Sequence, residues 1–283
     1  MPSSRFISAL TSHSADSSMN GYPGSKGASG VSERIIRLQP PHGVYVEGFA
    51  GCAAVWRKKL AATSSVLIDV DAKLCHRLRS YIAGRDDAAR CEVLHGDAMD
   101  LVPSLPAVRS SDTLVYFDAP YMRATRSNKL LYDCEFDTPE KHSALLAMAA
   151  ALPCFVQISH YPCKLYEKTL KRWWYYEIPA MTRGGLRTEG LWCNFPEPKV
   201  LHDHRFAGKD YRERERIKRK RKRWLVKFQD MDARERQVIA AALAGVDRAA
   251  MAAALRIPPS EATVAAAIAG PGDAADREER NVS

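Results

Sequence analysis

Short apolar runs alternate with segments of helical spacing along most of the chain. Apolar runs of about five residues predict buried strands, and longer segments with apolar residues every three or four positions predict helices. The predicted strands are 44–47, 65–69, 91–95, 113–117, 154–159, 173–178 and 190–195. The predicted helices are 32–38, 53–60, 72–83, 139–152 and 163–171. This alternation is typical of βαβ units and predicts an α/β domain with a buried parallel sheet. The aromatic run in strand 173–178 is expected in the core.

Acidic residues follow three of the predicted strands, at Asp69, Asp97 and Asp118. Ligands bind beyond the carboxyl ends of the strands in such sheets, so these carboxylates are candidates for a binding site. A second interpretation stays open for Asp69, which could cap the helix that begins at Ala72 and leave Asp71 as the ligand residue. Gly-Asp, as at Asp97, is also a common turn sequence.

Composition divides the chain into a central domain and two different ends. We predict a disordered N-terminus over 1–20, the α/β domain over 21–200, a basic helical extension over 201–269 and a disordered tail over 270–283. Residues 212–223 carry nine basic and two acidic side chains, and the whole chain has a formal net charge of +9. This charge balance favours a polyanionic partner such as nucleic acid.

The seven cysteines are odd in number and form no C-x-x-C pair. That pattern argues against a disulfide framework and against a zinc site, so no metal is expected. The N-terminus lacks the apolar run of a signal peptide, and no apolar stretch is long enough to span a membrane. These features favour a reducing cytoplasm and exclude a membrane partner.

The segment Asp118-Ala119-Pro120-Tyr121 directly follows an apolar strand and carries the most specific chemistry. The amino group of adenine is a poor nucleophile because its lone pair is delocalised into the ring. A carboxylate and a neighbouring backbone carbonyl can accept both amino hydrogens and stabilise the positive charge that develops on nitrogen. Pro120 stiffens the turn, and the Tyr121 ring can stack on a base taken out of a duplex.

This segment resembles the D-P-P-Y motif of amino methyltransferases, with Ala119 in place of the first proline. Segments 22–26, 45–51, 68–71 and 96–97 follow the motif order of the Dam-like DNA adenine methylase family, which makes the resemblance specific over about residues 22–198. The resemblance implies a Rossmann-like S-adenosylmethionine-dependent methyltransferase fold with a C-terminal helical extension. It also implies methyl transfer from S-adenosylmethionine to the exocyclic amino group of adenine in double-stranded DNA, by a cytoplasmic enzyme of a bacterium or a phage.

The resemblance further implies roles for single residues. Asp118, Pro120 and Tyr121 would form the catalytic segment. The residues that would bind or border S-adenosylmethionine are Tyr22, Lys26, Phe49, Gly51, Asp69, Asp97 and Asp118. Asp69 would accept hydrogen bonds from the ribose hydroxyls, and the loop from Phe49 to Gly51 would let the backbone approach the methionine part closely.

Two basic segments are candidates for contacts with DNA phosphates. The loop around Arg183 and Arg187 lies between the last two predicted strands, where it is expected near the active face, and the run 212–223 lies in the extension. The residues expected to bind phosphates in that run are Arg219, Lys220, Arg221 and Lys222. Both segments could also be plainly solvated. His160, which follows a strand, could contact DNA, although a lone histidine is more often structural.

Three departures from the family pattern bear on function. Ala119 replaces a proline, Cys52-Ala53 stands where a second glycine is usual, and the connector between Asp97 and Asp118 is too short for the inserted recognition domain of longer relatives. Alternatives to DNA adenine methylation are RNA adenine methylation, cytosine amino methylation, and DNA binding by a degenerate, non-catalytic domain. The helical segments 235–243, 249–255 and 261–268 could form a helix-turn-helix or a packing bundle; the last lacks Arg, Lys, Asn and Gln, which favours the bundle.

Overall fold

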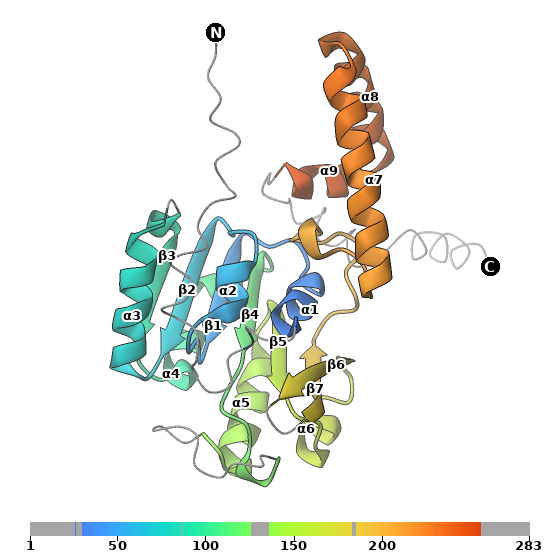
Figure 1. Cartoon of the computed structure of the whole chain (residues 1–283). Coiled ribbons are helices and arrows are strands. Elements are labelled where there is room, and N and C mark those ends of the chain that lie inside the picture. The colour runs from blue at the N-terminus through green and yellow to red at the C-terminus, as the bar shows by residue number, and fades with distance from the viewer. Residues whose placement is uncertain (1–25, 27–29, 86, 126–135, 183–184, 256–283) are drawn as a thin grey trace, which may run out of the picture.

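The computed structural model describes residues 26, 30–85, 87–125, 136–182 and 185–255. Their centre is a seven-stranded sheet with the order β3-β2-β1-β4-β5-β7-β6 (Figure 1). The strands are β1 Val44–Gly48, β2 Ser64–Asp69, β3 Cys91–His95, β4 Thr113–Phe117, β5 Phe155–His160, β6 Trp174–Thr182 and β7 Gly185–Cys193. Strands β1 to β5 pair in parallel, whereas β7 runs antiparallel to both β5 and β6. The predicted α/β fold is therefore confirmed, and the prediction of a parallel sheet is right for β1 to β5 but wrong for β6 and β7.

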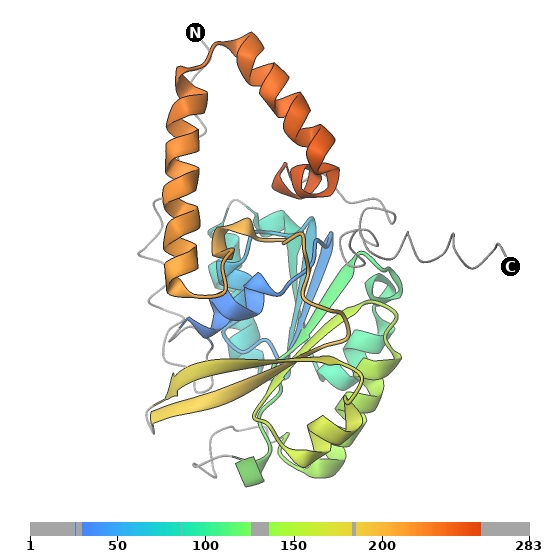
Figure 2. The same ribbon diagram turned by 90° about the vertical axis from the view of Figure 1, so that its right-hand side faces the viewer.

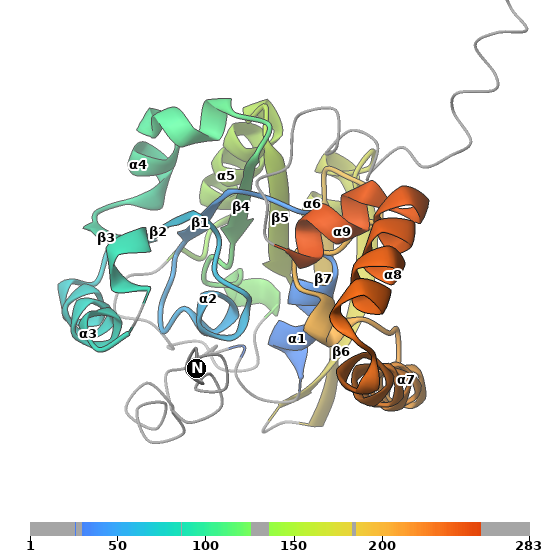
Figure 3. The same cartoon turned by 90° about the horizontal axis from the view of Figure 1, so that it is seen from above.

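Helices cover both faces of the sheet, as the view from above shows (Figure 3). One face carries α1 Val31–Arg37, α2 Ala54–Lys58 and α3 Ala72–Ala83, and the other carries α4 Ala98–Ser104, α5 Pro139–Ala151 and α6 Lys164–Thr169. Each face has its own cluster of buried apolar side chains, because a parallel sheet must be shielded from water on both sides. The core is thus a three-layer arrangement with its loops left at two edges.

Local sequence signals explain where two of these helices begin. Thr138 accepts a hydrogen bond from the backbone N–H of Lys141, and Pro139 occupies the first helical position of α5. Asp71 accepts from the N–H groups of Lys73 and Leu74 and so caps α3. Helix α4 was not predicted; Asp97 accepts the Met99 N–H and caps it, and Pro103 lies near its end.

The last two strands form a hairpin longer than the sequence predicted. β7 enters the sheet between β5 and β6, which leaves β6 as the edge strand. The prediction that the aromatic run of this strand is buried is wrong for Trp174 and Tyr175, which are 53% and 40% exposed. Pro179 also lies on this edge strand, where the missing N–H costs no ladder hydrogen bond.

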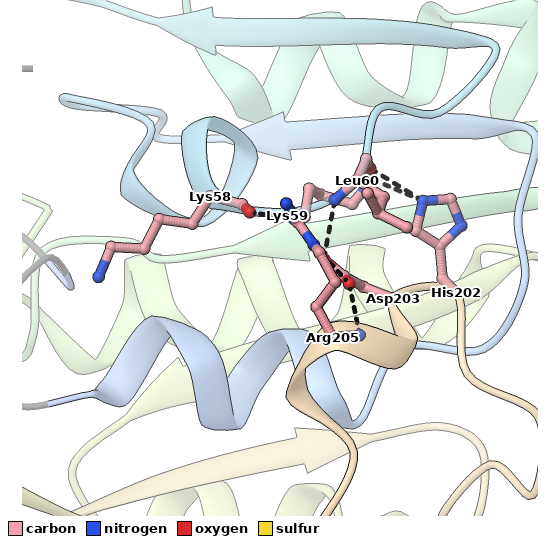
Figure 4. A network of polar contacts seen from close by, with 6 residues as sticks. All are labelled: Lys58, Lys59, Leu60, His202, Asp203 and Arg205. Carbon is pink, nitrogen blue, oxygen red and sulfur yellow. Dashed lines mark hydrogen bonds and ion pairs between the residues drawn. The ribbon is translucent and has the colours of Figure 1, made fainter. Parts of the chain in front are cut away.

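A polar network ties the segment after the sheet to the end of α2 (Figure 4). Asp203 has no exposed surface and accepts from the Leu60 N–H at 2.9 Å and from Arg205. His202 lies 3.0 Å from the Leu60 carbonyl, and Arg205 donates to the Lys58 carbonyl at 2.6 Å. The short helix η6 His204–Phe206 is thereby held against the end of α2.

The C-terminal extension leaves the body from this anchored segment. Helix α7 Tyr211–Asp230 is followed by α8 Ala233–Val246 and α9 Arg248–Ala254, and neither α7 nor α8 contains a buried residue. Figures 1 and 2 show α7 and α8 projecting beyond the edge at which the parallel strands begin, opposite to their carboxyl ends. A helix of 20 residues is about 30 Å long, so α7 extends well past the sheet.

Candidate active site

Asp118 follows β4 at the carboxyl edge of the sheet. Every residue of β4 is buried, and β4 pairs with β1 on one side and β5 on the other, so the sheet fixes where Asp118 lies. The Asp118 side chain is only 17% exposed, and Ala119 behind it is buried. The structure therefore places a carboxylate, largely shielded from water, at the edge where ligands are expected.

Lys26 is the centre of a buried cluster of charged groups around this carboxylate. Its Nζ lies 2.8 Å from Oδ1 of Asp118, 2.7 Å from Oε1 of Glu189 and 2.6 Å from the Tyr121 hydroxyl. The Tyr121 hydroxyl in turn donates to Oε1 of Glu189. An ammonium group has three N–H donors, and these three contacts use all of them. The predicted cofactor ligand Lys26 is thus bound to the predicted catalytic carboxylate.

Burial is the main cause of the unusual titration of Asp118. Burial raises the pKa of this carboxyl to about 6; the Lys26 ammonium lowers it and the Glu189 carboxylate raises it again. Burial disfavours the charge on Lys26, but the carboxylates of Asp118 and Glu189 outweigh it and hold the pKa of Lys26 above its usual range. Lys26 is therefore charged at neutral pH, and Asp118 is ionised above about pH 6.

Aromatic side chains hold the ring of Tyr121 in place. The ring lies 4.9 Å from that of His160 and 4.7 Å from that of Tyr161, measured between centroids. His160 is fully buried; its Nε2 accepts the Met122 N–H at 3.0 Å, and its Nδ1 lies 2.6 Å from the Tyr161 carbonyl, which assigns a neutral ring protonated at Nδ1. His160 orients the segment after Asp118, which agrees with its structural interpretation.

The loop after β1 has the backbone geometry of a close-approach turn. Phe49, Gly51 and Ala53 have φ values of 59°, 53° and 48°, in the left-handed region that favours glycine. Ala53 stands where the resembling family usually has glycine, and its conformation costs about 1–2 kcal/mol. The buried apolar surroundings of Ala53 and the helix that starts behind it keep the loop in this shape.

Asp69 connects this loop to the turn after β2. Its Oδ2 accepts the Gly51 N–H at 2.7 Å and its Oδ1 accepts the Asp71 N–H at 2.8 Å. Asp71, by contrast, is occupied as the cap of α3. Between the two interpretations of this strand end, the geometry therefore favours Asp69 as the residue that faces the candidate cofactor site.

Glu47 links β1, which precedes this loop, to α2, which follows it. Its Oε2 accepts from the Tyr45 hydroxyl at 2.9 Å and from the Trp56 N–H at 3.2 Å. Burial raises the pKa of this carboxyl to about 8, the Tyr45 hydroxyl acts in the opposite direction, and the Asp118 carboxylate adds to the rise. Glu47 is therefore largely protonated at neutral pH, so it acts as a buried hydrogen-bonding group.

The other predicted residues lie in different places. Asp97 is exposed at the carboxyl end of β3, where it accepts the Met99 N–H and caps α4. The guanidinium carbon of Arg187 lies 5.5 Å from the centre of the Tyr161 ring, which brings Arg187 to the active edge. Tyr22 and Arg183 lie outside the described residues. The four basic residues predicted to bind phosphates are exposed on α7, a helix that projects beyond the opposite edge of the sheet (Figure 1): Arg219, Lys220, Arg221 and Lys222.

Glu189 is the residue that sequence reasoning missed. Gly190 pairs with His160, so Glu189 lies one position beyond the end of β5, at the same edge as Asp118. The signal was a single acidic residue directly before the apolar segment that begins at Gly190. Assigning Glu189 to the site requires knowing that β7 runs antiparallel. Only then do residues that precede its pairing with β5 lie at the carboxyl ends of the parallel strands.

Among the described residues, no three His, Cys, Asp or Glu side chains are grouped so that they could hold a metal ion. The cysteines in that part of the chain are free thiols. None of the helices described here is both long and apolar enough to cross a bilayer.

The strand order, with the antiparallel β7 between β5 and β6, is that of the Rossmann-like S-adenosylmethionine-dependent methyltransferase fold. No protein-family model and no curated protein matches the sequence.

Solved structures similar to this chain share little sequence with it. A conserved hypothetical protein of Streptococcus pyogenes is 16% identical, with a TM-score of 0.39 over 59% of this chain and 96% of that one. The C-terminal domain of precorrin-6Y C5,15-methyltransferase from Rhodobacter capsulatus is 14% identical, with a TM-score of 0.38 over 56% and 83%. A dimethyladenosine transferase from Plasmodium falciparum is 12% identical, with a TM-score of 0.38 over 57% and 59%.

Proposed function

We propose that this protein is an S-adenosylmethionine-dependent methyltransferase that methylates the exocyclic amino group of adenine in double-stranded DNA. The observation that carries the proposal is the position of Asp118. It is a shielded carboxylate at the carboxyl end of the central strand, followed by Ala119, Pro120 and Tyr121, and it lies at the same sheet edge as the loop Phe49 to Gly51 and Asp69.

The residues at this edge fit S-adenosylmethionine. A carboxylate has about four acceptor positions, and backbone N–H groups use two of those on Asp69, which leaves capacity for the two ribose hydroxyls. The left-handed backbone at Gly51 exposes main chain without a side chain and suits the polar methionine end. When bound, S-adenosylmethionine supplies an electrophilic methyl group on a sulfonium sulfur.

The chain's own residues prepare the acceptor. The Asp118 carboxylate and the Ala119 carbonyl accept the two amino hydrogens of adenine, which weakens the delocalisation of the nitrogen lone pair. Bond formation between the amino nitrogen and the methyl carbon would break the carbon–sulfur bond, leave a neutral thioether and move the positive charge from sulfur to nitrogen. The Asp118 carboxylate would stabilise this charge in a site of low dielectric. Asp118 or water then takes the surplus proton. The Tyr121 ring provides a stacking face for the base.

The proposal that the substrate is duplex DNA rests on basic side chains around the site and on α7, rather than on the catalytic residues themselves. Arg187 lies at the active edge, and the extension carries the strongly basic α7. Phosphate contacts of this kind give affinity without sequence preference. We propose that Arg187 and Arg183 contact the strand that is methylated, while α7 binds phosphates elsewhere on the duplex.

The test is methyl incorporation from labelled S-adenosylmethionine into double-stranded DNA and into RNA, followed by digestion to nucleosides. We expect label in N6-methyladenine from DNA, and none with the Asp118→Asn variant. Label in RNA alone, or in methylated cytosine, would replace the proposed substrate. DNA binding without any incorporation would favour a non-catalytic binding protein.

A further inference from the structure

Two carboxylates share one ammonium group in the candidate active site. The Lys26 ammonium contacts Oδ1 of Asp118 and Oε1 of Glu189, at 2.8 and 2.7 Å, and all three side chains are largely buried. Buried charges are normally paired one to one, because an uncompensated charge in the interior is costly. A second carboxylate on the same lysine therefore needs an explanation.

The net charge of the cluster explains why the second carboxylate is present. Lys26 and Asp118 alone form a neutral pair, and a carboxylate neutralised by an ammonium group at 2.8 Å is poorly suited to stabilise a new cation beside it. With Glu189 included, one positive and two negative charges leave a net charge of −1. A net negative charge is what a positively charged amino nitrogen requires from its surroundings.

Glu189 also fixes the geometry of the site. Its Oε1 accepts from both the Lys26 ammonium and the Tyr121 hydroxyl. The Lys26 ammonium lies 4.6 Å from the centre of the Tyr121 ring, so the ring, the ammonium and the carboxylate form one packed unit. This unit joins the end of β4 to the middle of β7 across β5.

We propose that Glu189 is a positioning residue whose carboxylate anchors Lys26 and Tyr121 and leaves the cluster with the net negative charge that Asp118 needs to bind the amino group of the substrate. This inference rests on the proposed function for its consequence in catalysis. The charge relation between Glu189 and Asp118 is a property of the folded protein, and it can be measured without any substrate.

Several other titratable groups lie near Asp118 and could also affect its pKa. Besides Lys26, Glu189 and Tyr121, the groups that interact with it electrostatically are Tyr45 and Glu47 from β1, Tyr116 from β4 and Tyr166 from α6. The tyrosines are uncharged at neutral pH, because burial raises the pKa of each. Glu189 is thus the second carboxylate in direct contact with the lysine that holds Asp118.

The experiment compares Glu189→Gln with Glu177→Gln in the full-length protein. Glutamine keeps the size and one oxygen acceptor but removes the charge. Glu177 is exposed on the neighbouring strand β6 and provides the matched control. Carbon-13 NMR of labelled aspartate carboxyls, with Asp118→Asn to identify the resonance, measures the pKa of Asp118 in each variant.

We expect Glu189→Gln to lower the pKa of Asp118 from about 6, because a neighbouring negative charge is removed. Its kcat at pH 8 should fall about tenfold to a hundredfold, while the acid limb of its pH–rate profile moves to lower pH. Glu189→Asp should recover part of the rate. Glu177→Gln should change neither the pKa nor the rate.

An unchanged Asp118 pKa in Glu189→Gln overturns the inference, whether or not the wild type methylates adenine. A lower rate with an unmoved acid limb also overturns it, since that pattern indicates a purely structural role. A wild type that methylates no nucleic acid, together with a shifted Asp118 pKa, would reject the proposed function and leave the charge relation established.

Discussion

Removing the Asp69 side chain tests the candidate cofactor site in the most direct way. In Asp69→Ala, the N–H groups of Gly51 and Asp71 lose acceptors at 2.7 and 2.8 Å. Each buried donor left without a partner costs about 1–3 kcal/mol, so the free energy of unfolding should fall by about 2–4 kcal/mol when water replaces part of the loss. Because Asp69 is only 9% exposed, little of this effect is screened by solvent.

The same substitution should weaken S-adenosylmethionine binding. A hydrogen bond to a charged acceptor contributes roughly 1.5–3 kcal/mol, which corresponds to an affinity about 10- to 100-fold lower. Asp69→Asn separates the two effects, because the amide keeps one acceptor oxygen. We expect it to regain about half of the lost stability while its affinity for the cofactor remains low.

Asp71→Ala is the matched control. It removes the cap of α3 and should cost about 1 kcal/mol of stability without a loss of cofactor affinity. Urea unfolding of the ligand-free proteins and isothermal titration calorimetry with S-adenosylmethionine give the two quantities. Wild-type affinity in both Asp69 variants, with weakened binding in Asp71→Ala, would refute the reasoning and move the ribose contact to Asp71.

Three further predictions concern catalysis, stability and the basic helix. Asp118→Asn should lower kcat at least a hundredfold with an unchanged circular dichroism spectrum, and the wild-type rate should fall about tenfold per pH unit below pH 6, where the carboxyl of Asp118 is protonated. The unfolding free energy of the wild type, relative to Glu47→Gln, should be highest below about pH 4.5 and fall by about 5 kcal/mol as the pH rises from there to above 8, because the folded state holds the Glu47 proton more tightly than the unfolded state. Urea unfolding at these two ends of the pH range measures the difference, and an equal difference at both would contradict the prediction. Neutralising the basic run of α7 should reduce DNA affinity on all sequences and flatten its salt dependence by up to about 0.9 log units per lost contact, and an unchanged slope would show a solvated helix. The four residues to neutralise are Arg219, Lys220, Arg221 and Lys222.

The sequence was sufficient to predict the parallel strands β1 to β5, because the apolar runs have the length of buried strands. Strands β3 and β4 begin and end where the pattern predicts. As expected, Asp69 is the last residue of β2, and Asp118 directly follows β4. Helix α3 also has its predicted bounds, since Asp71 provides a cap and Gly84 follows its end. Such features depend on local chemistry, which a single sequence contains.

Features that depend on contacts between distant segments could not be predicted in the same way. Trp174 and Tyr175 were expected in the core, because nothing local reveals that β6 is an edge strand. The contact of Lys26 with Asp118 joins residues that are 92 positions apart in the sequence, and no local pattern indicates it. Glu189 reaches the same point only because β7 is inserted in the opposite direction.

The direction of that strand is also what makes the site possible. Parallel strands bring only residues that follow strands to the carboxyl edge, and these must serve the cofactor as well as the substrate. The antiparallel β7 brings to this edge the residues that precede its pairing with β5, so Glu189 and Arg187 can act there without belonging to a strand–helix loop. One strand, β7, thereby supplies both a carboxylate that balances Lys26 and a basic side chain beside Tyr161. Substitutions on the loops after β1 and β2 should then alter mainly cofactor binding, whereas substitutions on β7 should alter mainly the acceptance of the substrate.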